Sequence, residues 1–199
     1  MIIMGHRGAA GLEPENTLLS IERAMEIGVD AVEIDVRLSK DKELVVIHDA
    51  TVDRTTNGTG PVSSYALKEM KNLDAGKGET IPTLQEVIDL IGDKVKLVIE
   101  LKEEGTEGGV VELIKRNNLD DNVYVISFWH GLVKTVKEMD SRIKTGVLLI
   151  RKATSAREIS GLGNTSVSPV STWDSPKDDK DVGREPMPLD LSFIFNQHG

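Results

Sequence analysis

Short runs of apolar, mostly β-branched residues recur along the first three quarters of the chain and alternate with segments of helical periodicity. Side chains in a strand alternate between two faces, whereas apolar residues three and four apart share one face of a helix. On this basis we expect strands at Ile2–Met4, Ala31–Leu38, Leu44–His48, Leu97–Leu101, Val123–Ser127 and Gly146–Ile150, and a seventh near Thr165–Val170. The alternation predicts an α/β fold with helices covering a parallel sheet.

The helices are predicted from amphipathic spacing and from residues that cap helix ends. Asn16–Ile27 carries its apolar residues mostly on one face, and Gly28 follows as a left-handed stop. Thr83 and Glu86 have capping-box spacing at the start of a helix over residues 83–91. Further helices are expected at residues 109–117 and 132–139, and a short one at residues 64–73.

The chain is predicted to form one domain with an insertion and a tail. Its 199 residues are 39% apolar, which is enough for one sizeable core. We place this domain at residues 1–170, with a turn-rich insertion at about 49–80. Four of the seven prolines fall between Pro169 and Pro188, and no clear periodicity runs through that segment. Residues 171–199 are therefore predicted to be an irregular tail.

Charge and composition exclude several classes of function. The net charge is −9, which argues against general binding to nucleic acids or anionic membranes, because both require a broad positive field. The chain has no cysteine and so forms neither disulfides nor thiolate metal sites. Its first apolar run is too short for a signal peptide or a membrane span, which favours a cytoplasmic protein. An anionic substrate would need positive charge supplied locally by a bound cation or a few basic side chains.

Two predicted strands carry charged residues on a face that should be apolar. Period two puts Glu33, Asp35 and Arg37 on the same face of the second strand, and Glu100 and Lys102 on one face of the fourth. In a helix-covered parallel sheet both faces are normally apolar. A cation held between carboxylates at the open end of a barrel would explain the pattern, and oxygen ligands favour Mg²⁺ or Ca²⁺. The alternatives are a solvated edge strand and a plain Glu100–Lys102 or Glu100–Arg37 ion pair.

Two histidines also follow predicted strands. His6 comes after the first strand and His48 ends the third. A single histidine at a strand end is more often structural than catalytic. Here, however, the unusual polar groups share one end of their strands, where active sites lie in parallel α/β folds. These converging residues are His6, Glu33, Asp35, His48, Glu100 and Lys102. We interpret Asn16, Asp49 and Asp53 as loop and cap residues rather than ligands.

The predicted set of groups is sufficient to cleave a phosphodiester. A divalent ion and Arg7 could neutralise the phosphate, while two imidazoles move protons to and from the alkoxide oxygens. Arg7 precedes Gly8, so that its guanidinium could approach an anion closely.

Six short motifs resemble the glycerophosphodiester phosphodiesterase family and occur in the order of that family over about residues 1–150. They are Gly5-His6-Arg7-Gly8, Pro14-Glu15-Asn16-Thr17, Glu33-Ile34-Asp35-Val36, Val46-Ile47-His48-Asp49, Ile81-Pro82-Thr83-Leu84 and Ile99-Glu100-Leu101-Lys102. Residues 54–58 and the loop to Thr83 also resemble the compact insertion of that family.

The resemblance implies a TIM-type (β/α) barrel and hydrolysis of a small glycerophosphodiester to glycerol 3-phosphate and an alcohol. It implies Mg²⁺ or Ca²⁺ held by Glu33, Asp35 and Glu100. His6 and His48 match the acid–base pair of the family, Arg7 matches a phosphate ligand, and Lys102 matches a charged group in the same pocket. Attack by the glycerol hydroxyl of the substrate, giving a cyclic phosphate, is a second route found in such enzymes.

The last quarter departs from the family pattern. Family members usually close the barrel with an eighth strand ending in Trp-Thr, whereas Trp173 is followed here by Asp174. We therefore expect a barrel that is incomplete or irregular at its C-terminal end, with open edges that would allow homo-oligomers to form. A non-catalytic glycerophosphodiester-binding protein is the competing interpretation, although a binder has no need of paired proton carriers.

Overall fold

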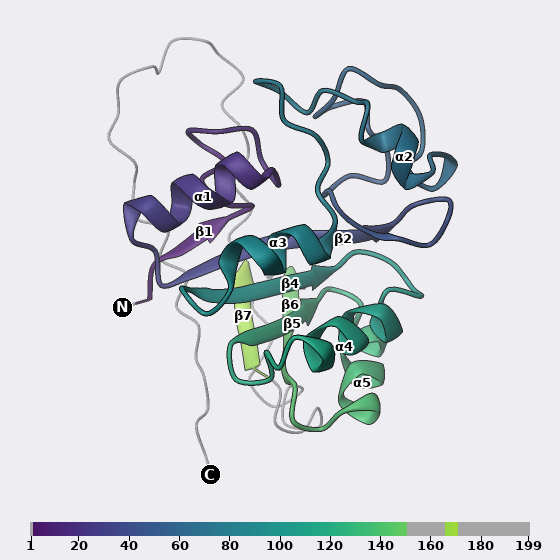
Figure 1. Cartoon of the computed structure of the whole chain (residues 1–199). Coiled ribbons are helices and arrows are strands. Elements are labelled where there is room, and N and C mark those ends of the chain that lie inside the picture. Colours follow the sequence, from purple (N-terminus) through teal and green to yellow (C-terminus); the bar gives the residue numbers. More distant parts are fainter. Residues whose placement is uncertain (1, 151–165, 171–199) are drawn as a thin grey trace.

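The computed structural model describes residues 2–150 and 166–170, and within them a seven-stranded sheet is covered by helices (Figure 1). The strands are β1 (Met4–His6), β2 (Ala31–Leu38), β3 (Leu44–Val46), β4 (Lys96–Leu101), β5 (Val123–Ser127), β6 (Lys144–Ile150) and β7 (Ser166–Val170). Strands β1, β2, β4, β5, β6 and β7 follow one another across the sheet in that order, and each neighbouring pair is parallel. The α/β prediction is confirmed: the arrangement is that of part of a TIM-type barrel.

The two faces of the sheet bury different groups. The main core lies between the sheet and the helices α1 (Leu18–Ile27), α3 (Leu84–Ile91), α4 (Glu107–Arg116) and α5 (His130–Met139). On β2 this face carries Val32, Ile34 and Val36, as period two predicts. The opposite face has a small apolar cluster of Ala31, Val98, Ile126 and Leu148. The next position along β2 on that face is Glu33. The carboxylates therefore follow the small apolar cluster in the direction of the C-terminal ends of the strands.

The third strand is the main departure from the predicted topology. The interpretation of Leu44–His48 as a parallel strand is wrong, because β3 pairs antiparallel with β2, with Leu38 opposite Leu44 and Val36 opposite Val46. Residues 39–43 are too few for the crossover of about a dozen residues that a parallel connection needs. Strand β2 therefore overruns its parallel neighbours, and the chain returns alongside it as a hairpin.

Most helix ends agree with the predicted caps. Gly28 ends α1 with φ 85°, and the Thr83–Glu86 capping box is formed at the start of α3. Helix α1 begins at Leu18 with Thr17 as its cap, so the predicted start at Asn16 is wrong. Asn16 has φ 56°, which a helix does not allow. Helices α4 and α5 each begin two residues earlier than predicted.

The insertion between β3 and α3 has a small core of its own. A 3₁₀ turn (Val62–Ser64) and helix α2 (Leu67–Met70) replace the single short helix predicted there. Six buried apolar residues form this insertion core: Val45, Ile47, Val52, Val62, Met70 and Ile81. The insertion is thus packed onto β3 and its continuation rather than onto the main core.

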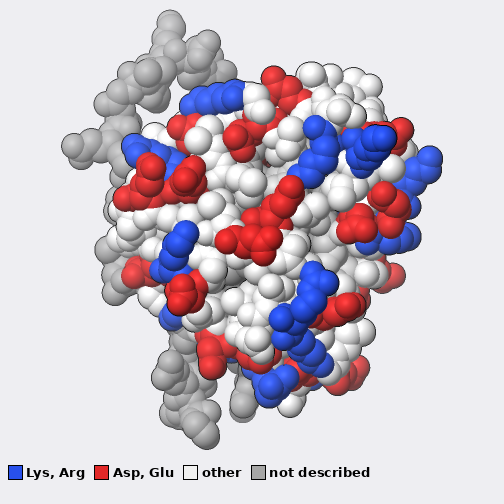
Figure 2. Space-filling model, viewed as in Figure 1, with Lys and Arg blue, Asp and Glu red and all other residues white. Residues whose placement is uncertain are grey.

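The predicted tail at residues 171–199 lies outside the described residues, and the division into domain and tail stays a prediction. Among the residues described, no helix is both long enough and apolar enough to span a bilayer. On the face shown in Figure 2, acidic and basic side chains are intermixed and do not form a broad basic area.

We expect Thr83→Ala to lower the free energy of unfolding by about 1 kcal/mol, the usual effect of losing an N-terminal cap. The side-chain oxygen of Thr83 accepts a hydrogen bond from the backbone N–H of Glu86, with an N to Oγ1 distance of 3.1 Å, and the substitution removes this bond. Urea denaturation followed by circular dichroism measures the change. Thr135→Ala in α5 is the control, because the Thr135 hydroxyl bonds within its own helix and caps nothing. Equal losses in the two variants would contradict the capping role.

Candidate active site

Three buried carboxylates meet on neighbouring strands at one edge of the sheet. Glu33 and Asp35 come from β2 and Glu100 from β4, with relative exposures of 2%, 0% and 6%. The sheet register places Asp35 directly beside Glu100. One oxygen from each of the three side chains lies within 4.8 Å of the others, so the group could hold a metal ion. The convergence that the strand pattern predicts is therefore found.

Electrostatics within this cluster fit a bound cation. Burial, together with the charges of Asp35 and Glu100, holds the pKa of Glu33 well above its usual value. Burial and Asp35 also raise the pKa of Glu100, against the opposing effect of Lys102. Asp35 Oδ1 is buried and accepts no hydrogen bond from any described group. A buried oxygen without a hydrogen bond is costly, and a hard divalent cation would approach it more closely than Lys102 Nζ does, at 3.5 Å.

The ion pair considered as an alternative explanation of the fourth strand is present as well. Lys102 Nζ lies 2.8 Å from Glu100 Oε1 and 3.5 Å from Asp35 Oδ1. Arg37 does not pair with Glu100; its guanidinium bonds Glu103 and the carbonyl oxygen of His48. Even with Arg7, which lies 3.4 Å from Asp35, two cationic side chains face three carboxylates, so the pair accompanies the cluster and does not account for it.

The end of β1 brings His6 and Arg7 to the same edge. His6 is paired in register with Glu33, and its Nε2 lies 3.8 Å from Glu33 Oε2, with half of the side chain exposed. Partial burial and the charge of Arg7 lower the pKa of His6, against the opposing effect of Asp35. The backbone N–H of Arg7 donates to Glu33 over 2.9 Å, which fixes the turn after the strand.

The Arg7 side chain lies between two acidic groups. Its Nη1 donates to Glu15 Oε1 over 2.8 Å, and its Nε is 3.4 Å from Asp35 Oδ2. Arg7 Nε is buried and makes no hydrogen bond to the described residues. This guanidinium is therefore held beside the carboxylate cluster, where it adds positive charge next to Asp35.

His48 reaches the site by a different path from the one predicted. It was expected at the C-terminal end of a parallel strand, but it follows the antiparallel β3. The N–H of Ile47 donates to the carbonyl of Asp35 over 3.0 Å, and Arg37 Nε donates to the carbonyl of His48 over 2.9 Å. These bonds hold His48 beside the middle of β2, near enough to His6 for its charge to lower the pKa of that residue.

The sequence interpretation missed four residues that support this site. Asn16 was interpreted as a cap, yet its amide donates to Asp35 Oδ2 over 2.9 Å and accepts from the N–H of Asp35. Asp49 accepts from His48 Nδ1 over 2.6 Å. Glu15 and Arg54 complete the set by binding each other. The available signals were their places in or beside the motifs that resemble the family, and the Glu-Asn-Thr turn, in which asparagine tolerates a positive φ.

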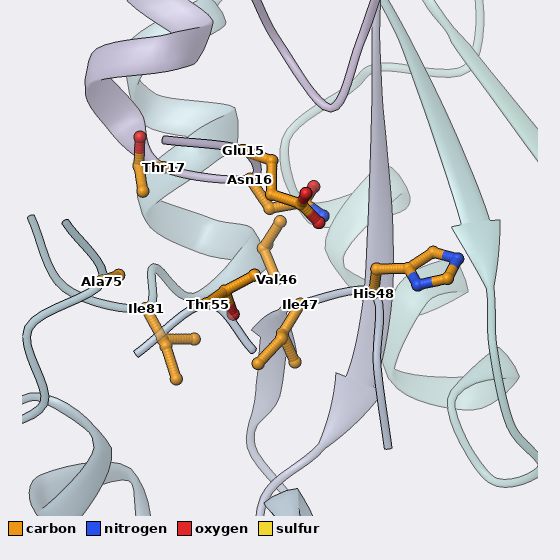
Figure 3. Close-up of a pocket in the computed structure, with 9 residues that line it drawn as sticks. All are labelled: Glu15, Asn16, Thr17, Val46, Ile47, His48, Thr55, Ala75 and Ile81. Atoms are coloured by element: carbon orange, nitrogen blue, oxygen red, sulfur yellow. The ribbon is translucent and has the colours of Figure 1, made fainter. Parts of the chain in front are cut away.

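A small cavity lies behind these residues and is lined by Glu15, Asn16, Thr17, Val46, Ile47, His48, Thr55, Ala75 and Ile81 (Figure 3). Its volume of about 10 Å³ is close to the minimum for a single water molecule. In Figure 3 the ring of His48 points away from the apolar side chains of Ile47 and Ile81. A phosphodiester is much too large for this cavity, so a substrate would have to bind at the open edge that carries His6 and Arg7.

The model of the glycerophosphoryl diester phosphodiesterase family matches residues 6–174 of the chain. A glycerophosphodiester phosphodiesterase of Caldanaerobacter subterraneus is 47% identical over 160 residues, which cover 74% of this chain and 66% of the relative. An Oleispira antarctica phosphodiesterase, solved in complex with the product sn-glycerol-3-phosphate, is 35% identical with a TM-score of 0.76 and covers 81% of this chain and 72% of its own. The chain spans about two thirds of the length of the curated relatives it matches.

A second solved structure, of a glycerophosphodiester phosphodiesterase from Agrobacterium tumefaciens, is 32% identical with a TM-score of 0.70. The match covers 75% of this chain and 67% of that one. Both solved structures are thus similar to the described part of the chain in fold as well as in sequence.

We expect Gly8→Ala to destabilise the protein by about 2 kcal/mol or more. Gly8 has φ 77°, and an added Cβ would lie 2.6 Å from the carbonyl carbon and 2.8 Å from the carbonyl oxygen of Ser20, so the turn that carries Arg7 would have to move. The midpoint of urea denaturation measures the effect. Gly11→Ala in the same loop is the matched control, because nothing lies within 4 Å of its added Cβ. A Gly8→Ala midpoint equal to that of Gly11→Ala would contradict the prediction.

A second prediction concerns the carboxylate cluster. Because the folded state raises the pKa of Glu33, this group lowers the stability of the fold progressively as the pH rises above its ordinary value of 4.5 and until the pH passes the raised value. Without divalent ions at pH 7, we therefore expect Glu33→Gln to be at least as stable as the wild type. Added Mg²⁺ or Ca²⁺ should raise the melting temperature of the wild type but not that of Glu33→Gln.

The control for this experiment is Glu138→Gln, which changes an exposed carboxylate paired with Lys134 on α5. It should keep the wild-type increase in melting temperature upon addition of the ion. An equal increase in Glu33→Gln would rule out the cluster as the ion site.

Proposed function

The chain belongs to the glycerophosphoryl diester phosphodiesterase family, and from this premise we propose that it hydrolyses glycerophosphodiesters to glycerol 3-phosphate and an alcohol. One observation carries the proposal: three buried carboxylates at one edge of a parallel sheet lie beside His6, Arg7 and Lys102. His48 reaches the same strand, because the N–H of the residue before it donates to the carbonyl of Asp35. The substrate would be a small molecule bound at this open edge, with Mg²⁺ or Ca²⁺ held by Glu33, Asp35 and Glu100. A function in lipid and glycerol metabolism would follow from that substrate.

The proposed roles follow from charge and position. A divalent ion bound by the carboxylates would polarise the phosphoryl group and offset its negative charge. Arg7 would bind a non-bridging phosphate oxygen, since its guanidinium lies beside the cluster and carries the positive charge that an anion needs. Lys102, held by Glu100, would add a second positive charge at the same pocket.

Proton transfer would fall to His6 and His48. Hydrolysis forms one bond from phosphorus to an attacking oxygen and breaks the bond to the alcohol oxygen. One proton must leave the nucleophile and one must join the departing alkoxide. Two imidazoles at one edge of the site can take these two roles, because an imidazole ring can both accept and donate a proton.

Two other functions remain to be distinguished by experiment. If the glycerol hydroxyl of the substrate attacks and a stable cyclic phosphate is the product, as in a lyase or phospholipase of related architecture, phosphorus NMR of the products separates this activity from hydrolysis. If the protein only binds glycerophosphodiesters, isothermal titration would give binding without heat of turnover. Assembly of copies through open sheet edges stays a prediction, and so does the cytoplasmic location.

The direct test is release of glycerol 3-phosphate from glycerophosphocholine by His6→Ala and Glu100→Ala. We expect His6→Ala to lower kcat by roughly 10²-fold or more, since general acid–base groups contribute about 10²–10⁴-fold. Glu100→Ala should also lower kcat strongly, because it removes one of the three proposed ligands of the ion. Circular dichroism should report an intact fold in both.

His130→Ala is the matched control, because the His130 ring bonds the carbonyl of Leu148 and not the carboxylate cluster. We expect it to keep the wild-type rate. An unchanged rate in His6→Ala or Glu100→Ala would remove the role assigned to that residue.

A further inference from the structure

Arg54, in the insertion, makes four hydrogen bonds to two carboxylates. Its Nη1 and Nη2 donate to the two oxygens of Glu15, each over 2.7 Å. Its Nε donates to Asp49 Oδ2 over 2.7 Å and its Nη2 to Asp49 Oδ1 over 3.1 Å. The two carboxylates come from segments far apart in the sequence, so Arg54 joins the loop after β1 to the segment after β3.

Each of these carboxylates has a second partner in the candidate active site. Glu15 also accepts from Arg7, and Asp49 also accepts from the ring of His48, 2.6 Å away. The five side chains thus form one hydrogen-bonded chain in which basic and acidic groups alternate. It runs from Arg7 through Glu15, Arg54 and Asp49 to His48. The proposed phosphate ligand and one proposed proton carrier are connected through a residue that touches neither.

The contact with Asp49 decides which nitrogen of His48 is free. Asp49 is ionised at neutral pH, as an ordinary aspartate is, and can only accept hydrogen bonds; the Arg54 guanidinium, bonded to both of its oxygens, lowers its pKa further and holds it in place. Nδ1 of His48 must then be the donor in their contact, which leaves Nε2 free to exchange a proton with another molecule. A carboxylate that fixes a histidine tautomer in this way acts on catalysis without touching the substrate.

A simpler interpretation is a surface ion pair of little energetic value. About half of the Arg54 side chain is exposed, and isolated exposed pairs contribute roughly 0–1 kcal/mol. Arg54, however, is bidentate to Glu15 and part of a network, the case in which such pairs do matter. Without it, Glu15 and Asp49 would face each other as two like charges. The loop is also anchored, since Val52, two residues earlier, is fully buried in the insertion core.

We propose that Arg54 is a positioning residue, which holds Asp49 against His48 and Glu15 against Arg7. The insertion would then be part of the catalytic apparatus, because it supplies the bridge between the two halves of the site. The kinetic part of this inference rests on the proposed hydrolytic function. The structural part, that Arg54 sets the tautomer of His48, does not.

The experiment compares Arg54→Met and Arg54→Lys with the wild type by two measurements. The first is nitrogen-15 NMR of the imidazoles, with the His48 signals assigned by their loss in His48→Gln. The second is the steady-state kinetics of glycerophosphocholine hydrolysis at saturating divalent ion. Arg23→Met is the matched control, because Arg23 is equally exposed and pairs with Glu26 on α1, and it should match the wild type in both.

In the wild type we expect neutral His48 to carry its proton on Nδ1. In Arg54→Met the ring should move toward the Nε2–H tautomer, and kcat should fall by about 10- to 100-fold, as for other residues that orient a functional side chain. Arg54→Lys keeps the charge but not the bidentate geometry, so it should give an intermediate result. If Arg54→Met does not fold, the lysine variant alone decides.

Wild-type imidazole signals in a folded Arg54 variant would overturn the proposal, whatever the rate. A shifted tautomer with an unchanged kcat would overturn the kinetic part. If the wild type itself releases no glycerol 3-phosphate, the proposed function fails, and the imidazole signals still test the link between Arg54 and His48. The two failures are therefore distinguishable.

Discussion

The structure depends on one electrostatic constraint: three carboxylates share a space that water barely reaches. Glu33, Asp35 and Glu100 are all less than 7% exposed, and the cost of crowding their charges is visible in the raised pKa of Glu33 and of Glu100. The apolar cluster of Ala31, Val98, Ile126 and Leu148 lies next to them on the same face of the sheet and shields them from solvent on that side. The surrounding donors, which are the Asn16 amide, the Arg7 backbone and the Lys102 ammonium, are placed where they offset part of this charge. A cation would offset the rest.

Some of the residues around this cluster come from segments that the parallel sheet alone would not bring together. Strand β2 overruns its neighbours, and the hairpin that follows returns His48 to the level of Asp35. The loop before α1 is not helical at Asn16, which has a left-handed conformation and donates its side-chain amide to the same carboxylate. Local regularity is therefore lost at two places where the site requires a side chain, a pattern typical of functional sites.

The sequence predicted those parts of the site that depend on local geometry. Period two placed Glu33 and Asp35 on one face, and parallel strands brought Glu100 beside them, because the pleat of a strand is a short-range property. The hairpin at β3 could have been predicted from the five-residue connection, which is too short for a crossover. The contact of Arg54 with Glu15 joins residues 39 apart, and no local pattern encodes such a pairing. Asn16 was missed because a cap and a buried amide ligand look alike in sequence.

The positions of the two histidines depend on different interactions. His6 continues β1, so its position follows from the hydrogen bonds between β1 and β2, and it is as rigid as the sheet. His48 follows the three-residue antiparallel strand β3, whose middle residue, Val45, is part of the insertion core. Its placement depends on that small core, on the Arg37 contact to its carbonyl and on Asp49 at its ring. A small core tolerates less loss of packing than a large one. Substitutions that disrupt the insertion core should thus displace His48 while leaving His6 and the carboxylates in place. The insertion is therefore the part of the fold in which a substitution distant from the carboxylates most easily disrupts the site.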